Sequence, residues 1–219
     1  MQTMIPSLLL NRRALLLLPL LAPAAARAQG IAAAPSPRDR ADLARIETYL
    51  DGLRSLKARF LQVAPDGSTA EGTAWLERPG RMRFEYDPPS PLLMVAGHGL
   101  FFFHDSQLRQ TTNLPLSATP LGLLLRDNLR LSGDVTVTGV SRLPGQIQVA
   151  MVRTNSPQDG SLSLVFADNP LQLRQWSVVD SRRQETRVTL FDIRLGGSFD
   201  PKLFTFTPQD GSGQPNGGG

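Results

Sequence analysis

Few residues in this sequence have the types and spacing of a catalytic site. The two histidines are His98, which lies between two glycines, and His104, which precedes Asp105. A histidine in a glycine-rich hairpin is typical of a solvated turn, and a histidine at a strand end is typical of a surface position. We therefore expect neither histidine to act as a general base.

Motifs for catalysis and cofactor binding are also missing from the sequence. It has no H-E-x-x-H, no G-x-S-x-G, and no phosphate-binding or dinucleotide-binding glycine pattern. Carboxylates alternate with arginines, as in residues 180–187, which is typical of a solvated strand face. Two carboxylates could still meet in the fold as a glycosidase pair. An enzyme is thus the weaker class, and we expect no catalytic residue, cofactor or metal site.

The sequence contains no cysteine. This excludes disulfides, thiolate catalysis, cysteine metal sites and a lipidated N-terminal cysteine. We therefore expect an unanchored protein whose stability comes from one sizeable core.

The first 28 residues have the pattern of a signal peptide. Arg12 and Arg13 precede a leucine-rich core over Ala14–Leu21, and Ala26-Arg27-Ala28 resembles a cleavage site before Gln29. The apolar run is too short for a spanning helix. The two arginines also loosely fit a twin-arginine signal, although the very hydrophobic core favours the general secretory route. Cleavage would remove three arginines and lower the formal charge from +4 to +1. Nothing in this charge suggests a basic surface for binding nucleic acid.

The elements that must position any site begin with one amphipathic helix over Arg38–Lys57. Ser36 is its expected N-cap, Pro37 lies in its first turn, and Asp39 reaches back to the cap. Its apolar stripe follows helical spacing and comprises Leu43, Ile46, Leu50, Leu53 and Leu56.

After Ala58 the apolar period becomes two, and turn dipeptides separate short strands, which predicts a meander of antiparallel strands. The predicted strands are Arg59–Val63, Ala70–Leu76, Arg81–Tyr86, Leu92–Val95, Leu100–His104, Leu108–Thr112, Val135–Ser141, Gln146–Arg153, Ser161–Phe166, Gln172–Val179, Glu185–Arg194 and Leu203–Thr207. A leucine-rich interruption over Asn113–Leu131 contains Thr119-Pro120, which can cap a short helix. Residues 210–219 form a glycine-rich tail that we expect to be flexible.

Both faces of the predicted sheet carry apolar groups, most clearly over Leu100–Phe103. The helix can cover part of one face, and the leucine-rich insert Leu114–Leu131 is the candidate cover for the other. The insert either completes a dry core or forms a lid over a hydrophobic cavity. Bulky aromatic residues are few for so many strands, with ten Phe, two Trp and two Tyr, which favours unfilled space.

Six motifs follow one another along the chain: Trp75-Leu76-Glu77-Arg78-Pro79-Gly80, Met82-x-Phe84-x-Tyr86, Asp87-Pro88-Pro89, Gly97-x-x-Leu100, Thr119-Pro120 and Phe204-Thr205-Phe206-Thr207-Pro208. Together they resemble one family, the periplasmic outer-membrane lipoprotein carrier (LolA) family. The resemblance implies a single α+β domain over residues 29–209. Its fold would be a strongly curved antiparallel sheet, an unclosed half-barrel, with an N-terminal helix and a short lid helix over a hydrophobic cavity. Ala96-Gly97 departs from the Asp-Gly that is frequent in the family.

The resemblance also implies a function and a site. Such a carrier binds the acyl chains of lipoproteins, accepts them in the periplasm from an inner-membrane lipoprotein-releasing ABC transporter, and delivers them to an outer-membrane receptor lipoprotein; we expect a monomer. Arg78 matches the arginine that hydrogen-bonds the closed lid, although an ordinary surface arginine at a strand end is the alternative. A carrier or sensor of another lipid, such as a glycolipid, also remains open. The expected cavity residues are Met82, Phe84, Tyr86, Leu93, Val95, Phe101, Phe103, Leu121, Leu124 and Leu125.

Overall fold

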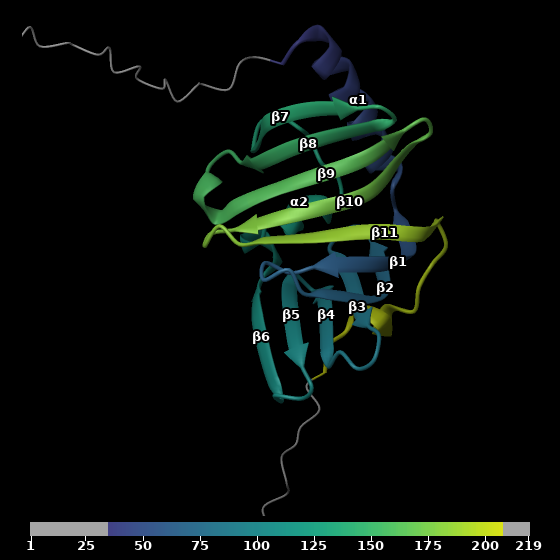
Figure 1. Ribbon diagram of the computed structural model, residues 1–219, viewed down its shortest axis with the longest axis vertical. Helices are drawn as coiled ribbons and strands as arrows, with labels where there is room; N and C mark the ends of the chain where they lie inside the picture. The colour runs from purple at the N-terminus through teal and green to yellow at the C-terminus, as the bar shows by residue number, and fades with distance from the viewer. Residues whose placement is uncertain (1–34, 208–219) are drawn as a thin grey trace, which may run out of the picture. The chain divides into compact units, whose positions relative to one another are not determined.

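The computed structural model describes residues 35–207 and contains one antiparallel sheet of eleven strands with an N-terminal helix and a short second helix (Figure 1). The expected signal peptide over residues 1–28 and the expected tail over 210–219 lie outside the described residues, so the predicted domain limits of 29 and 209 stay predictions. Within residues 35–207, no helix is both long enough and apolar enough to cross a membrane.

The sheet has the strand order β6-β5-β4-β3-β2-β1-β11-β10-β9-β8-β7, and all of its pairs are antiparallel. Apart from the β1–β11 pair, every neighbour in the sheet is also a neighbour in sequence. Strands β6 and β7 form the two edges, so the sheet stays open and the expected half-barrel is confirmed. The strands are β1 (Ser55–Val63), β2 (Thr69–Glu77), β3 (Arg81–Tyr86), β4 (Leu92–Gly97), β5 (Leu100–Asp105), β6 (Gln110–Pro115), β7 (Val135–Leu143), β8 (Gln146–Arg153), β9 (Gly160–Asp168), β10 (Leu171–Asp180) and β11 (Glu185–Leu195).

The sheet turns sharply near its middle. In Figure 1, β8 to β11 run across the view while β4 to β6 run up and down it. The register between β1 and β11 shifts between Lys57 and Arg59, which marks a bulge. A bulge bends its strand and increases the local twist, so it contributes to the curvature that gives the sheet a concave face.

Helix α1 (Pro37–Gly52) begins as the sequence predicts. The Ser36 hydroxyl accepts a hydrogen bond from the Asp39 N–H at 3.1 Å, and the Asp39 carboxylate accepts one from the Ser36 N–H at 3.0 Å. The helix ends at Gly52, five residues before the predicted Lys57. The apolar stripe continues past this end because Leu53 and Leu56 are buried from the following turn and from β1.

The core lies on the concave face of the sheet. Leu43, Ile46 and Leu50 of α1 pack there in one cluster with Phe60, Phe84 and Phe166 of the strands. The leucines of the insert between β6 and β7 belong to the same cluster. The expectation that the insert covers the second face is therefore wrong, since α1 and the insert share one face.

The C-terminal segment covers the other, convex face of β3 to β5. It contains a 3-10 turn, η3 (Pro201–Phe204), where a twelfth strand over Leu203–Thr207 was predicted. The Leu203 carbonyl accepts a hydrogen bond from Arg83 at 3.2 Å, and the Phe206 ring stacks on Phe102 with centroids 5.2 Å apart. Gly97 lies directly beneath the Phe204 carbonyl, where a Cβ atom would not fit. This segment explains why β5 is apolar on both sides.

Replacing Phe204 by alanine should destabilise the protein, because this side chain is only 2% exposed and truncation leaves a cavity. We expect Phe204→Ala to lower the free energy of unfolding by about 3 kcal/mol. Urea denaturation measures this, with Leu143→Ala as control because Leu143 is 66% exposed. Equal midpoints for the two variants would show that the segment is not part of the fold.

Candidate functional site

An apolar cavity of about 430 Å³ lies on the concave side of the sheet. One wall comes from β1 and β3 to β6, the opposite wall comes from β10 and β11, and the insert forms the roof. The lining residues are Gln62, Met82, Phe84, Met94, Phe101, Phe103, Leu114, Ala118, Thr119, Pro120, Leu121, Asp159, Trp176, Val178, Asp180, Ser181, Thr186 and Val188.

Five of the expected cavity residues line this cavity: Met82, Phe84, Phe101, Phe103 and Leu121. Strand alternation explains the grouping, since Phe84 pairs with Met94 and Met94 pairs with Phe103 across adjacent strands. Side chains at directly paired positions point to the same face.

The expectation for Leu93 and Val95 is wrong. They pair with Glu85 and Arg83 and lie on the convex face, one residue out of phase with Met94. A shift of one residue along a strand reverses the face. The residue that lines the cavity from this strand is therefore Met94.

Three other expected residues are buried but do not line the cavity. Leu124 and Leu125 belong to the packed core beneath the insert. Tyr86 lies next to the Phe60 ring, and its hydroxyl donates a hydrogen bond to Gln62 Oε1 at 2.8 Å. Burial raises the pKa of the Tyr86 phenol, so it stays neutral and acts as a hydrogen-bond donor.

Sequence reasoning missed the wall formed by β10 and β11. Trp176, Val178 and Val188 lie on that wall because β11 pairs with β1, which places the end of the sheet beside its beginning. Period-two alternation in β10 predicts that Trp176 and Val178 lie on the same face of the sheet. It does not predict which strands lie across the cavity from them.

The roof is the insert, which contains η1 (Leu116–Ala118) and helix α2 (Leu121–Leu124). In Figure 1, α2 lies behind β9 and β10, on the concave side. The Thr119 hydroxyl accepts a hydrogen bond from the Gly122 N–H at 3.0 Å and donates one to the Leu116 carbonyl at 2.9 Å. The Thr-Pro pair thus begins a short helix, as the sequence predicts.

Arg78 holds the C-terminal half of the insert. This side chain is buried, with 4% of its surface exposed, and it donates hydrogen bonds to three main-chain carbonyls. These belong to Arg126 at 2.6 Å, Asp127 at 3.3 Å, and Leu50 near the end of α1. Burial lowers the pKa of the guanidinium, and the negative end of the α1 dipole favours its charge.

Further bonds join α1 and the neighbouring β2–β3 turn to the same half of the insert. Glu47 accepts a hydrogen bond from the Leu131 N–H at 2.6 Å, and Asp51 pairs with Arg130 at 2.7 Å. The Gly80 N–H donates to the Leu125 carbonyl at 2.8 Å. The second half of the insert is therefore tied to α1 and to the turn.

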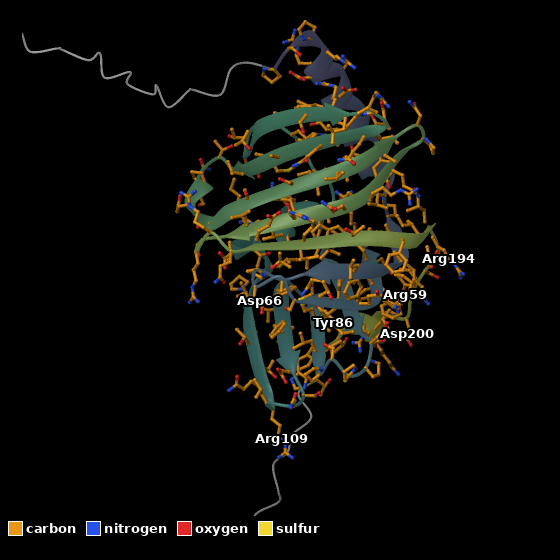
Figure 2. All side chains as sticks on the ribbon, viewed as in Figure 1. Arg59, Asp66, Tyr86, Arg109, Arg194 and Asp200 are labelled. Atoms are coloured by element: carbon orange, nitrogen blue, oxygen red, sulfur yellow. The ribbon has the colours of Figure 1, made fainter. Side chains whose placement is uncertain are left out.

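Apolar side chains make up most of the cavity lining. No histidine is among its described lining residues, and Asp159 and Asp180 are its carboxylates. Residues 35–207 contain no cluster of three or more His, Asp or Glu side chains able to hold a metal ion. Grooves of about 490 and 530 Å³ also occur, but arginines and other polar groups line them. Arg59 and Arg194, both labelled in Figure 2, line the first of these grooves.

Replacing Arg78 by leucine should destabilise the protein, because it leaves the Arg126 and Asp127 carbonyls without this donor and leaves the Leu50 carbonyl with the Leu53 N–H alone. We expect Arg78→Leu to lower the free energy of unfolding by about 2–4 kcal/mol. The control is Arg54→Leu, which removes only an exposed ion pair with Asp127 and should cost less than about 1 kcal/mol. Equal losses in urea denaturation would contradict the structural role of Arg78.

Comparison with known proteins finds similar structures and similar sequences. A solved LolA superfamily protein from Nitrosomonas europaea aligns over 75% of this chain and 97% of its own, with a TM-score of 0.42 and 10% identity. An outer-membrane lipoprotein carrier protein from Methylococcus capsulatus is 30% identical over 176 residues, or 76% of this chain and 84% of the relative. One from Azotobacter vinelandii is 26% identical over 196 residues, or 84% and 93%.

A family model described as outer membrane lipoprotein carrier protein LolA matches residues 51–207. This range includes all eleven strands, the roof of the cavity and Arg78. The chain therefore belongs to the LolA family of outer membrane lipoprotein carriers.

Proposed function

We propose that this protein is a periplasmic carrier that binds the acyl chains of lipoproteins and moves lipoproteins from the inner to the outer membrane without catalysing a reaction. The observation that carries the proposal is the apolar cavity of about 430 Å³ beneath the insert. Membership of the LolA family supports the choice of cargo.

The energetics explain why such cargo needs a carrier. Burial of each methylene is worth about 0.8 kcal/mol, so one acyl chain of about 16 carbons contributes on the order of 10 kcal/mol to membrane retention. Two or three chains make escape into water negligible. A carrier must therefore offer a comparable apolar surface, and non-directional burial suits cargo that shares its lipid but differs in its protein.

The volume of the cavity indicates how many acyl chains fit beneath the roof. A methylene group occupies about as much space as a water molecule in the liquid, about 30 Å³. A cavity of about 430 Å³ then corresponds to roughly one acyl chain. Cargo with three chains requires the roof to move outward, so the closed form favours release.

The proposed partners follow from this cycle. The sequence has no nucleotide-binding motif, so the energy for loading must come from the donor, which we propose is the inner-membrane lipoprotein-releasing ABC transporter. The acceptor is an outer-membrane receptor lipoprotein. Each transfer step involves one copy of this chain, which we propose is a monomer.

Filling the cavity should weaken the binding of acyl chains. Met94 lines the cavity, and its neighbour Leu93 on the same strand points to the convex face. We expect Met94→Trp to weaken binding of a fluorescent fatty-acid analogue at least tenfold, about 1.4 kcal/mol, because the indole fills space that the chain would use. Leu93→Trp is the matched control and should bind as the parent does. Equal binding by both variants would place the acyl site elsewhere.

The cargo can be identified directly. The protein is purified from the bacterial envelope under mild conditions, and co-purifying lipid is identified by mass spectrometry. Triacylated lipoprotein supports the proposal. A free glycolipid would instead make the protein a carrier or sensor of another lipid.

A further inference from the structure

The sheet has two edges, and the structure protects them unequally. At the β7 edge, the pairing with β8 shifts register between Val137 and Gly139. Arg142 of β7 also forms ion pairs with Asp39 and Asp42 of α1. Bulges and charged side chains are devices by which proteins keep an edge strand from pairing with another chain. Strand β7 is therefore a protected edge.

Strand β6 has neither a bulge nor a charge. Its six residues, Gln110–Pro115, are all uncharged, and its pairing with β5 shows no register shift. Residues 110–113 are exposed, and Figure 1 shows β6 as the outermost strand of its half of the sheet. The strand contains one proline, Pro115, which is its last residue. A strand edge of this kind is a template to which another extended chain can add.

The register shows which main-chain groups of β6 are free. The Leu116 N–H donates a hydrogen bond to the Gly99 carbonyl at 2.8 Å, and these two residues continue the β5–β6 register. Hydrogen-bonded and non-hydrogen-bonded pairs alternate along an antiparallel ladder. The even-numbered residues of β6 therefore bond to β5, whereas the N–H and C=O groups of Thr111 and Asn113 point to the open side. Within residues 35–207, no backbone hydrogen bond outside the strand ladders involves either residue.

This open edge adjoins the apolar cavity. Leu114 of β6 lines the cavity together with its cross-strand partner Phe101. The residues that roof the cavity follow β6 closely, beginning with Ala118. A chain that leaves the cavity past Leu114 therefore runs beside the main chain of Thr111 and Asn113.

We propose that β6 binds the polypeptide of the cargo as an added strand while the acyl chains occupy the cavity. This inference rests on the proposed function and deepens it, because the acyl chains of a lipoprotein are attached to the first residue of its polypeptide. The segment next to the acyl chains pairs in extended form with the outward N–H and C=O groups of Thr111 and Asn113.

Main-chain pairing suits cargo that differs in its protein part. Hydrogen bonds between strands do not depend on side chains, so one edge can accept many sequences. A few such bonds are weak alone, but a peptide tethered by acyl chains in the neighbouring cavity has a high effective concentration at the edge. Burial of the acyl chains then supplies most of the affinity, and β6 fixes the direction in which the polypeptide leaves the carrier.

Substitutions at Asn113 separate the main chain from the side chain. Asn113→Pro removes the outward N–H and keeps the ladder bonds to β5, because proline is tolerated where the N–H of an edge strand faces solvent. Asn113→Ala keeps the N–H and is the control. The probe is a fluorescent diacylated lipopeptide whose uncharged peptide is about six residues long. We expect Asn113→Pro to bind it at least about fivefold more weakly than the parent, and Asn113→Ala to bind it as the parent does. Parent-like binding by Asn113→Pro, or an equal loss in Asn113→Ala, would overturn the proposal.

A fatty acid without a peptide separates this proposal from the proposed function. Asn113 is not among the residues that line the cavity, so both variants should bind the fluorescent fatty-acid analogue as the parent does. Failure of the parent to bind the analogue would contradict the proposed function instead. Sedimentation measures the oligomeric state, and a parent dimer that Asn113→Pro abolishes would assign the edge to a second copy of this chain and overturn the proposal.

Amide hydrogen exchange of the unsubstituted protein does not depend on a variant. Saturation with the lipopeptide should slow exchange of the Thr111 and Asn113 amides at least about tenfold, whereas the fatty-acid analogue should not slow it. The Thr112 and Leu114 amides, which bond to β5, are internal controls and should change less. Unchanged exchange at Thr111 and Asn113 in the lipopeptide complex would show that no strand adds at β6.

Discussion

An antiparallel sheet that bends without closing leaves a broad apolar concave face, and the remaining structure depends on how that face is covered. Here α1 and the insert cover it together. They are joined by carbonyls that gather around one buried cation, Arg78, and by the bonds of Glu47 and Asp51. A buried guanidinium that binds only carbonyls in hydrogen bonds fixes positions precisely, because each donor has one direction.

This cover packs tightly against the strands on one side and leaves space beneath it on the other. Where leucines interdigitate with the strands, the core reaches near-zero exposure. Where the roof passes over Met94, Phe101 and Trp176, it covers unfilled volume instead. Close packing is the norm in protein interiors, and the N-terminal half of the insert departs from it. The family relationship gives the unfilled part its proposed use.

Local patterns in the sequence predicted local structure well. The bounds of β3 and β8 and the capping box of α1 are confirmed, because alternation and cap chemistry depend on neighbouring residues. The predicted end of α1 was wrong, because Leu53 and Leu56 fit helical spacing although they are buried in the following turn and in β1. The covers of the two faces could not be predicted, because they depend on where the C-terminal segment returns over β3 to β5.

The site was predictable to the same extent. Phe101 and Phe103 follow from alternation, whereas the expectation for Leu93 and Val95 failed because it ignored that period. The wall from β10 and β11 depends on a pairing between distant parts of the chain.

The pairing of β1 with β11 also determines the order in which the protein can be assembled. Phe60 lies opposite Leu190, so the middle of the sheet forms only after nearly the whole domain has been synthesised. Until then, β1 to β6 present an apolar face and an unpaired edge at β1, and such surfaces aggregate in partly folded chains. Contacts between residues this distant in sequence also form slowly. Until β11 pairs with β1, this lipoprotein carrier therefore exposes the same kind of apolar surface that it covers once folded.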